Sequence, residues 1–169
     1  ALPEDVAIRA TRAVPPDFDP RRWARKRWYR YTIANGEARD PLARRAAWFI
    51  GANLDFQAMQ QAAGAIAGTR DFIACSGPLE PGRTSVRTVF NAGWRSEGCT
   101  LLFDIEADAF LPQMVRRITG SLIRVGRGAE TVEEIVRLLQ QAEPGSMAYV
   151  APAHGLCLQR VWYDEGYTV

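Results

Sequence analysis

The sequence predicts an α+β domain in which helices pack on one face of a largely antiparallel sheet, and it assigns residues 1–169 to this single domain. Residues 101–109 alternate apolar and polar side chains, which is typical of a strand with one buried face. Residues 55–67 and 111–122 repeat apolar side chains at helical spacing. The predicted elements follow the order β, β, β, α, β, β, α, α, β, which favours an α+β sandwich. A chain of 169 residues is also long enough to bury a proper core.

Three strands are predicted before the first helix. Residues 6–14 alternate apolar side chains and end at two prolines. A second strand covers residues 27–34 and closes at Asn35-Gly36, a dipeptide suited to positive φ in a turn. An arginine-rich loop over residues 36–45 then leads to a short buried strand over residues 46–50.

The middle of the chain contains one helix and a hairpin. Asp55 is placed to cap the helix at its start, and Gly68 is a natural stop at its end. Residues 71–82 are interrupted by Gly-Pro and Pro-Gly pairs and are predicted to be irregular. Strands over residues 86–94 and 101–109 follow, separated by a short turn, and we expect them to pair as an antiparallel hairpin.

Two helices and a strand complete the domain. The first helix is amphipathic and covers residues 111–126. Thr131 and Glu134 form a capping box for the second, which includes residues 135–141. The last strand is predicted over residues 156–163.

Composition and charge exclude several classes of protein. Arginine supplies nearly all the positive charge, Lys26 is the only lysine, and cations concentrate in residues 21–31, where no acid occurs. The three cysteines are spaced too widely for a Cys-x-x-Cys metal site, and their odd number argues against a disulfide framework, so we expect reduced thiols in a cytoplasmic protein. No apolar run approaches the ~18 residues of a membrane span, and the first residues lack the pattern of a signal peptide. The missing initiator methionine predicts that the numbering begins inside a longer protein.

Residues 25–31 combine four cations with three aromatic side chains. Such a strip suits single-stranded RNA, because cations neutralise phosphates and aromatic rings stack on unpaired bases. If the strip is a strand, Trp28 and Arg30 point to one face and Tyr29 to the other. The alternative interpretation is an edge strand whose charged outer face prevents aggregation. The strip alone leaves both interpretations open.

Other polar groups give weaker signals. Asp104, Glu106 and Asp108 share one face of a predicted strand and could chelate a metal, but no histidine accompanies them, so we expect a solvated face with some arginine pairing. His154 is the only histidine, and its loop position favours a surface or turn role over hydrolase chemistry. Neither a P-loop nor a G-x-G-x-x-G pattern occurs, so no nucleotide cofactor is predicted.

Four arginines lie in or beside the predicted hairpin and the helix that follows it. Arg83 follows Gly82 in a loop that favours RNA contact over a phosphate cradle, and Arg87 lies four residues further on. Helical spacing points Arg116 and Arg117 away from the apolar stripe of their helix, where solvated arginines are the default.

The segment Ala109-Phe110-Leu111-Pro112-Gln113-Met114-Val115-Arg116-Arg117-Ile118-Thr119-Gly120-Ser121-Leu122 resembles the signature helix of the TruA family of tRNA pseudouridine synthases. Other segments resemble landmarks of this family in the same order. They are residues 1–6, 14–18 and 27–31, Asp71-Phe72, Arg83-Thr84 with Arg87, Val125-Gly126, and residues 154–156. On this resemblance the sequence is identified as a member of the family.

The resemblance implies that the protein isomerises uridine to pseudouridine at positions 38 to 40 in the anticodon arm of tRNA, without cofactor or metal, as a homodimer. It implies that Tyr29 lies against the flipped base and assists proton removal from carbon. It further implies that Arg116 pairs with the catalytic aspartate and keeps it ionised, because a neighbouring cation lowers the pKa of a carboxyl group. The residues expected to contact RNA are Arg25, Arg27, Arg30, Arg83, Arg87 and Arg117.

One departure from the family is large. The family's aspartate belongs to a Gly-Arg-Thr-Asp-Ala-Gly-Val-His segment that precedes the matching region, and this chain contains no such segment. Gly82-Arg83-Thr84-Ser85 resembles only its opening, with serine in place of the nucleophile. Pro112-Gln113 also replaces residues that are commonly more basic, or include histidine, in the family. We therefore expect a C-terminal domain that needs the N-terminal domain of the same protein for catalysis and is inactive alone. The alternative is a non-catalytic RNA-binding or dimerisation module.

Overall fold

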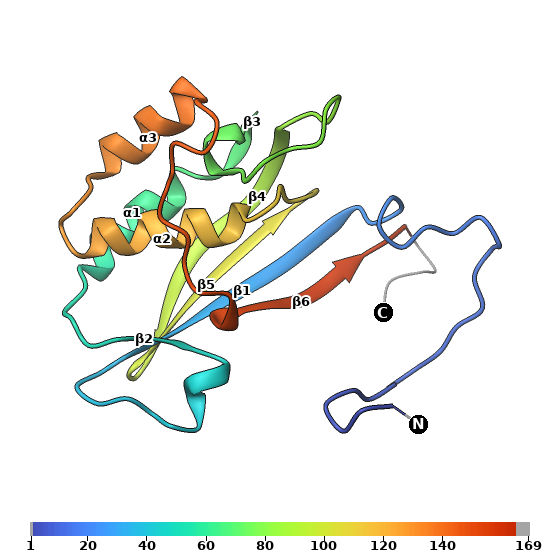
Figure 1. Cartoon of the computed structure of the whole chain (residues 1–169), viewed down its shortest axis with the longest axis horizontal. Coiled ribbons are helices and arrows are strands. Elements are labelled where there is room, and N and C mark those ends of the chain that lie inside the picture. Colours follow the sequence, from blue (N-terminus) through green and yellow to red (C-terminus); the bar gives the residue numbers. More distant parts are fainter. Residues whose placement is uncertain (1, 165–169) are drawn as a thin grey trace.

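The sheet is built around one long central strand. In the computed structural model, which describes residues 2–164, the six strands form a sheet of order β2-β1-β5-β4-β3, and β6 pairs with β1 beside β2 (Figure 1). Every pairing is antiparallel except that of β1 with β2. The strands are β1 (Lys26–Asn35), β2 (Trp48–Ile50), β3 (Gly68–Asp71), β4 (Val86–Glu97), β5 (Thr100–Ala107) and β6 (Leu156–Trp162).

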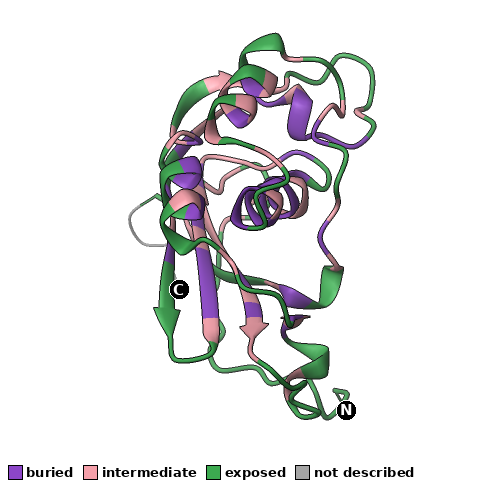
Figure 2. Cartoon of the chain, turned by 90° about the vertical axis from the view of Figure 1, so that its left-hand side faces the viewer, coloured by how far each residue is buried: buried purple, intermediate pink, exposed green. Residues whose placement is uncertain are grey.

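The helices are α1 (Phe56–Gly64), α2 (Met114–Gly126) and α3 (Val132–Gln141), and the short 3₁₀ turns are η1 (Ala43–Arg45), η2 (Ile73–Cys75) and η3 (Ala153–Gly155). All three helices share one core with the same face of the sheet, and in Figure 2 the buried residues concentrate in α2 and in the strands beside it. The predicted α+β class is therefore confirmed. Among residues 2–164, no helix combines the length and apolar character needed to cross a bilayer.

Local capping chemistry sets the helix starts as expected. The Asp55 carboxylate accepts a hydrogen bond from the Ala58 amide at 2.9 Å. Thr131 and Glu134 form the predicted capping box. Each bond satisfies an amide that the first helical turn leaves without a partner inside the helix.

The alternation predicted for β1 is present. Tyr31 and Ile33 point into the core and are fully buried, whereas Trp28 and Arg30 lie on the uncovered face. On that face Asp104 accepts hydrogen bonds from the indole of Trp28 at 2.7 Å and from the guanidinium of Arg30 at 2.8 Å. β1 is nevertheless not an edge strand, because it pairs with β5 on one side and with β6 and β2 on the other.

The acidic face of β5 is a paired, partly solvated surface. Lys26 forms an ion pair with Glu106 at 2.7 Å, and Asp104 also lies 3.4 Å from Arg95. Asp108 accepts hydrogen bonds from backbone amides. Within the described part of the chain, no three His, Cys, Asp or Glu side chains are grouped to hold a metal ion.

Several predicted boundaries are wrong. Residues 6–14 form no strand, and Val6 and Ile8 are exposed, because no neighbouring strand of the described chain pairs with this segment. A strand was missed at Gly68–Asp71, where Gly68 starts β3 instead of only ending a helix, with φ 114°. The helix predicted from Leu111 begins at Met114, because Gln113 takes a left-handed conformation with φ 61°.

A strap of chain over residues 142–152 leads from α3 to β6 and packs on α2 at Gly120. A methyl group on Gly120 would overlap the carbonyl oxygen of Tyr149 and lie 2.8 Å from its Cδ1. Glycine is thus required for this close approach. The strap is also bonded to the side chains of Arg116 and Arg117, as described below.

We expect Gly120→Ala to lower the free energy of unfolding by about 1–3 kcal/mol, because the strap must shift to admit the methyl group. Gly64→Ala is the matched control, since Gly64 is also helical and its added methyl group would meet no atom within 4 Å. Alanine is the better helix former, so the control should be neutral or more stable by up to about 1 kcal/mol. Urea denaturation of both variants measures the difference, and equal midpoints would contradict the close approach.

Cys75 is the one cysteine of the three that the core covers. Burial raises the pKa of its thiol to about 12, and its sulfur lies 3.0 Å from that of Met147. Cys99 and Cys157 are exposed. A thiol reagent at mildly alkaline pH should therefore label two cysteines quickly in the native protein and all three in urea. Rapid labelling of Cys75 in the native state would contradict this packing.

The raised pKa of the Cys75 thiol also predicts a pH dependence of stability. Since the unfolded Cys75 thiol ionises near 9.0, its contribution to the free energy of unfolding should fall as pH rises from about 9 towards 12.

Candidate active site

Tyr29 and Arg116 line the same pocket, which has a volume of about 190 Å³. Tyr29 extends from β1, and Arg116 lies in the first turn of α2. The ring of Phe110 meets that of Tyr29 edge to face, with centroids 5.1 Å apart and an interplanar angle of 85°. The sheet and α2 thus bring together the two residues that the resemblance singles out.

Arg116 is fixed by the strap. Its Nε donates a hydrogen bond to the carbonyl oxygen of Ala151 at 2.6 Å, and the Ala151 amide donates to the Arg116 carbonyl at 3.1 Å. Arg116 also lines the Tyr29 pocket. Burial raises the pKa of the nearby Tyr31 hydroxyl far above its usual range, and the charge of Arg116 only partly offsets this. Tyr31 is therefore neutral, and it donates a hydrogen bond to the carbonyl of Pro152 at 2.6 Å.

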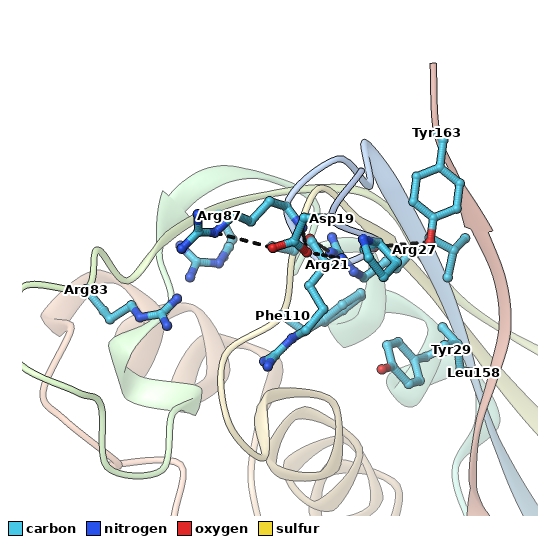
Figure 3. Close-up of a pocket in the computed structure, with 13 residues that line it drawn as sticks. Asp19, Arg21, Arg27, Tyr29, Arg83, Arg87, Phe110, Leu158 and Tyr163 are labelled. Carbon is cyan, nitrogen blue, oxygen red and sulfur yellow. Dashed lines mark hydrogen bonds and ion pairs between the residues drawn. The ribbon is translucent and has the colours of Figure 1, made fainter. Parts of the chain in front are cut away.

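A larger groove of about 680 Å³ adjoins this pocket at Tyr29 and Phe110. Its cationic lining residues are Arg21, Arg22, Arg27, Arg83 and Arg87. In Figure 3, Arg83 and Arg87 lie on one side of the groove and Tyr29 with Leu158 on the other. Asp19 also lines it, and the backbone amides of Arg22 and Arg21 hold the pKa of its carboxyl below the usual range.

The arginines of this groove differ in how they are held. Arg27 donates to the carbonyls of Asp108 and Arg21, at 2.6 and 2.5 Å. Arg83 is exposed and forms an ion pair with Glu80 at 3.1 Å. Arg87 donates from Nη1 to its own loop, whereas its Nε is buried without a hydrogen-bond partner. A buried donor without a partner is costly, so this Nε is an unfavourable feature of the groove wall.

Three of the predicted RNA-contacting arginines lie outside this groove. Arg25 forms an exposed ion pair with Asp164 at 2.8 Å. Arg30 is on the opposite face of the sheet, as its position next to Tyr29 in the alternation requires. Arg117 donates to the carbonyls of the strap, including that of Met147 at 2.9 Å. Their contacts with RNA remain predictions.

The structure adds groups that sequence reasoning missed. Arg21 lines the groove and lies in the cation-rich stretch, which was the available signal. Leu158 lies opposite Tyr29 in the register of β6 and is 45% exposed, and an exposed leucine beside an aromatic ring could stack against a planar ligand. The carbonyl of Ala151 had no sequence signal, because a backbone oxygen carries no side-chain pattern.

The groove can bind a polyanion through its guanidinium groups, while the Tyr29 pocket can accept a planar group beside aromatic and aliphatic side chains. The α+β fold thus brings a cationic groove and an aromatic pocket together on one side of the domain. The identity of the family follows from comparison with known proteins.

A sequence profile of the family described as tRNA pseudouridine synthase matches residues 62–164. A protein of Citrifermentans bemidjiense named tRNA pseudouridine synthase A is 41% identical over 97% of this chain and 66% of its own length. Proteins with the same name from a Geobacter species and from Myxococcus xanthus are 39% and 37% identical over 67% and 63% of their lengths. The chain therefore belongs to the tRNA pseudouridine synthase family, as the resemblance predicted, and it spans about two thirds of the length of these relatives.

Proposed function

We propose that the complete protein isomerises uridine to pseudouridine at positions 38 to 40 in the anticodon arm of tRNA, and that this chain supplies one half of the catalytic cleft. The observation that carries the proposal is the shared pocket of Tyr29 and Arg116, which opens beside an arginine-lined groove. The relatives' shared name supports the reaction and the class of RNA.

The groove would hold the RNA backbone, so that the target uridine leaves its stack at a cost of a few kcal/mol and enters the pocket. Tyr29, Phe110 and Leu158 would flank the flipped base. After the bond from N1 of the base to the ribose breaks, the ring turns, and a new bond forms between its C5 and the same ribose carbon. C5 then loses its proton to solvent and N1, no longer bonded to the ribose, gains one, so that the product is an isomer of uridine. The phenol of Tyr29 would assist by relaying the C5 proton.

The aspartate that the reaction requires would come from an N-terminal domain of the same protein. Arg116 would pair with that carboxylate and keep it ionised, since a cation beside a carboxyl group lowers its pKa. The first turn of α2 adds to this effect, because the positive end of a helix dipole favours a nearby anion. We further propose that the protein is a cytoplasmic homodimer.

Release of tritium from uridine labelled at C5 tests this function. The complete protein should release one tritium per modified uridine in tRNA, whereas residues 1–169 alone should release none. If the chain alone turns over, the nucleophile lies within it and the proposed division of the cleft is wrong. If the complete protein binds tRNA without any release, the chain belongs to a binding module.

A further inference from the structure

A second basic pocket lies towards the other end of β1. It has a volume of about 300 Å³, and its lining includes Arg39, Arg44 and His154 beside the rings of Trp48 and Phe49. None of these residues lines the groove or the Tyr29 pocket. The pocket is formed by the arginine-rich loop together with η3, two segments that are distant in the sequence.

The two arginines of this pocket are available to a ligand. All three basic side chains belong to exposed residues. No carboxylate of residues 2–164 forms an ion pair with Arg39 or Arg44. The guanidinium of Arg39 lies over the ring of Phe49, 5.3 Å from its centroid, which orients the charge without neutralising it. Asp40 also lines the pocket, and its Oδ1 is engaged by the Leu42 amide at 2.8 Å.

The pocket is rigidly connected to Tyr29 through β1. The Tyr31 hydroxyl is bonded to Pro152, and Gly155 packs on the Tyr31 ring so closely that a methyl group there would lie 2.6 Å from Cε1. These contacts fix η3, and hence His154, to β1. Ala34 of β1 itself lines the pocket. Since a strand rises about 3.3 Å per residue, Ala34 lies about 17 Å along β1 from Tyr29.

We propose that this pocket binds a backbone phosphate of the same RNA whose uridine occupies the Tyr29 pocket. Two guanidinium groups and an imidazole form a donor set that suits a phosphate. Phosphates along one strand of B-form DNA are spaced about 3.4 Å apart, and on that scale about 17 Å along β1 is roughly five nucleotides. Ala34 and Tyr29 point to opposite faces of the sheet, so this length is the minimum that an RNA in contact with both sites must span. A polyanion of at least this length that passes over the edge of the sheet at β2 would contact both sites. This inference rests on the proposed function for the identity of the RNA.

The test compares two double variants of the complete protein. Arg39→Ala/Arg44→Ala removes the proposed contacts, whereas Arg127→Ala/Arg137→Ala removes two exposed arginines beyond α2 and on α3. We expect the first variant to bind tRNA at least tenfold more weakly, with the slope of log affinity against log salt shallower by about one to two. Its single-turnover rate at saturating protein should equal that of the wild type. The control should match the wild type in both respects.

Wild-type affinity and slope in the first variant would overturn the proposal, as would a lower rate at saturation with unchanged affinity. Replacement of both arginines by lysine should preserve the salt slope, and it serves as the folded reference if the alanine variant is unstable. Phosphate ethylation interference gives a second readout: a phosphate roughly five or more nucleotides from the target uridine should be required by the wild type but not by the alanine variant. If the wild type binds tRNA without forming pseudouridine, the proposed function fails while the affinity comparison still decides this inference.

Discussion

Replacement of Arg116 by alanine in the complete protein should lower the single-turnover rate of pseudouridine formation by about 10²–10³-fold, which is typical for removal of one preorganised electrostatic group. The guanidinium is held by the Ala151 carbonyl on one side and opens to the Tyr29 pocket on the other. Without it, the incoming aspartate would lose its cation and a larger fraction would be protonated. The measurement is tritium release at saturating protein over a range of pH.

The pH dependence separates this role from a merely structural one. Loss of the cation should shift the acidic limb of the rate profile of Arg116→Ala towards higher pH, because the aspartate then ionises less readily. Arg127→Ala is the matched control and should leave rate and profile unchanged, since Arg127 is exposed beyond the end of α2. An Arg116→Ala variant with wild-type rate and an unshifted profile would remove Arg116 from the mechanism.

The second large effect is expected at Tyr29. Tyr29→Phe keeps the ring and its contact with Phe110 but removes the hydroxyl, so tRNA affinity should be retained. If the phenol assists removal of the C5 proton, the rate should fall by about 10²–10⁴-fold, the usual contribution of a positioned acid or base. Single-turnover kinetics and a binding titration on the same tRNA measure the two quantities separately.

Tyr149→Phe is the control for loss of a tyrosine hydroxyl. Tyr149 belongs to the strap and stacks on Trp48, with ring centroids 6.2 Å apart, and it lines neither the groove nor the Tyr29 pocket. This variant should be fully active. If Tyr29→Phe were also fully active, Tyr29 would act only as a stacking surface. A primary isotope effect at C5 that grows in Tyr29→Phe would further support slower proton removal.

The sequence correctly predicted the strands and helices in which apolar side chains recur with a clear periodicity. β5 and α2 follow their patterns because the apolar positions of each are buried in the core. Residues 6–14 show the same alternation without becoming a strand, because alternation favours an extended chain but only a neighbouring strand supplies the hydrogen bonds. β3 has the converse property: Gly68 to Asp71 carries no apolar pattern and is held by pairing with β4.

The candidate site was likewise predicted only in part from the sequence. Tyr29 and Arg116 were found through the resemblance, and alternation along β1 correctly separated Arg30 from Tyr29. Their convergence on one pocket depends on tertiary packing, which no local pattern reports. The role of the Ala151 carbonyl and the engagement of Arg117 by the strap involve backbone atoms, and these are invisible in a list of side chains.

The packing of Gly155 under the ring of Tyr31 has a consequence for which RNAs the protein would select. A constant spacing between two contact points favours ligands of matching length and rigidity, whatever their bases. Insertion of one nucleotide between the two contacted points should then be more harmful than any change of base there. Discrimination of this kind would depend on the contour of the folded RNA, and it would tolerate the sequence diversity of natural tRNA stems.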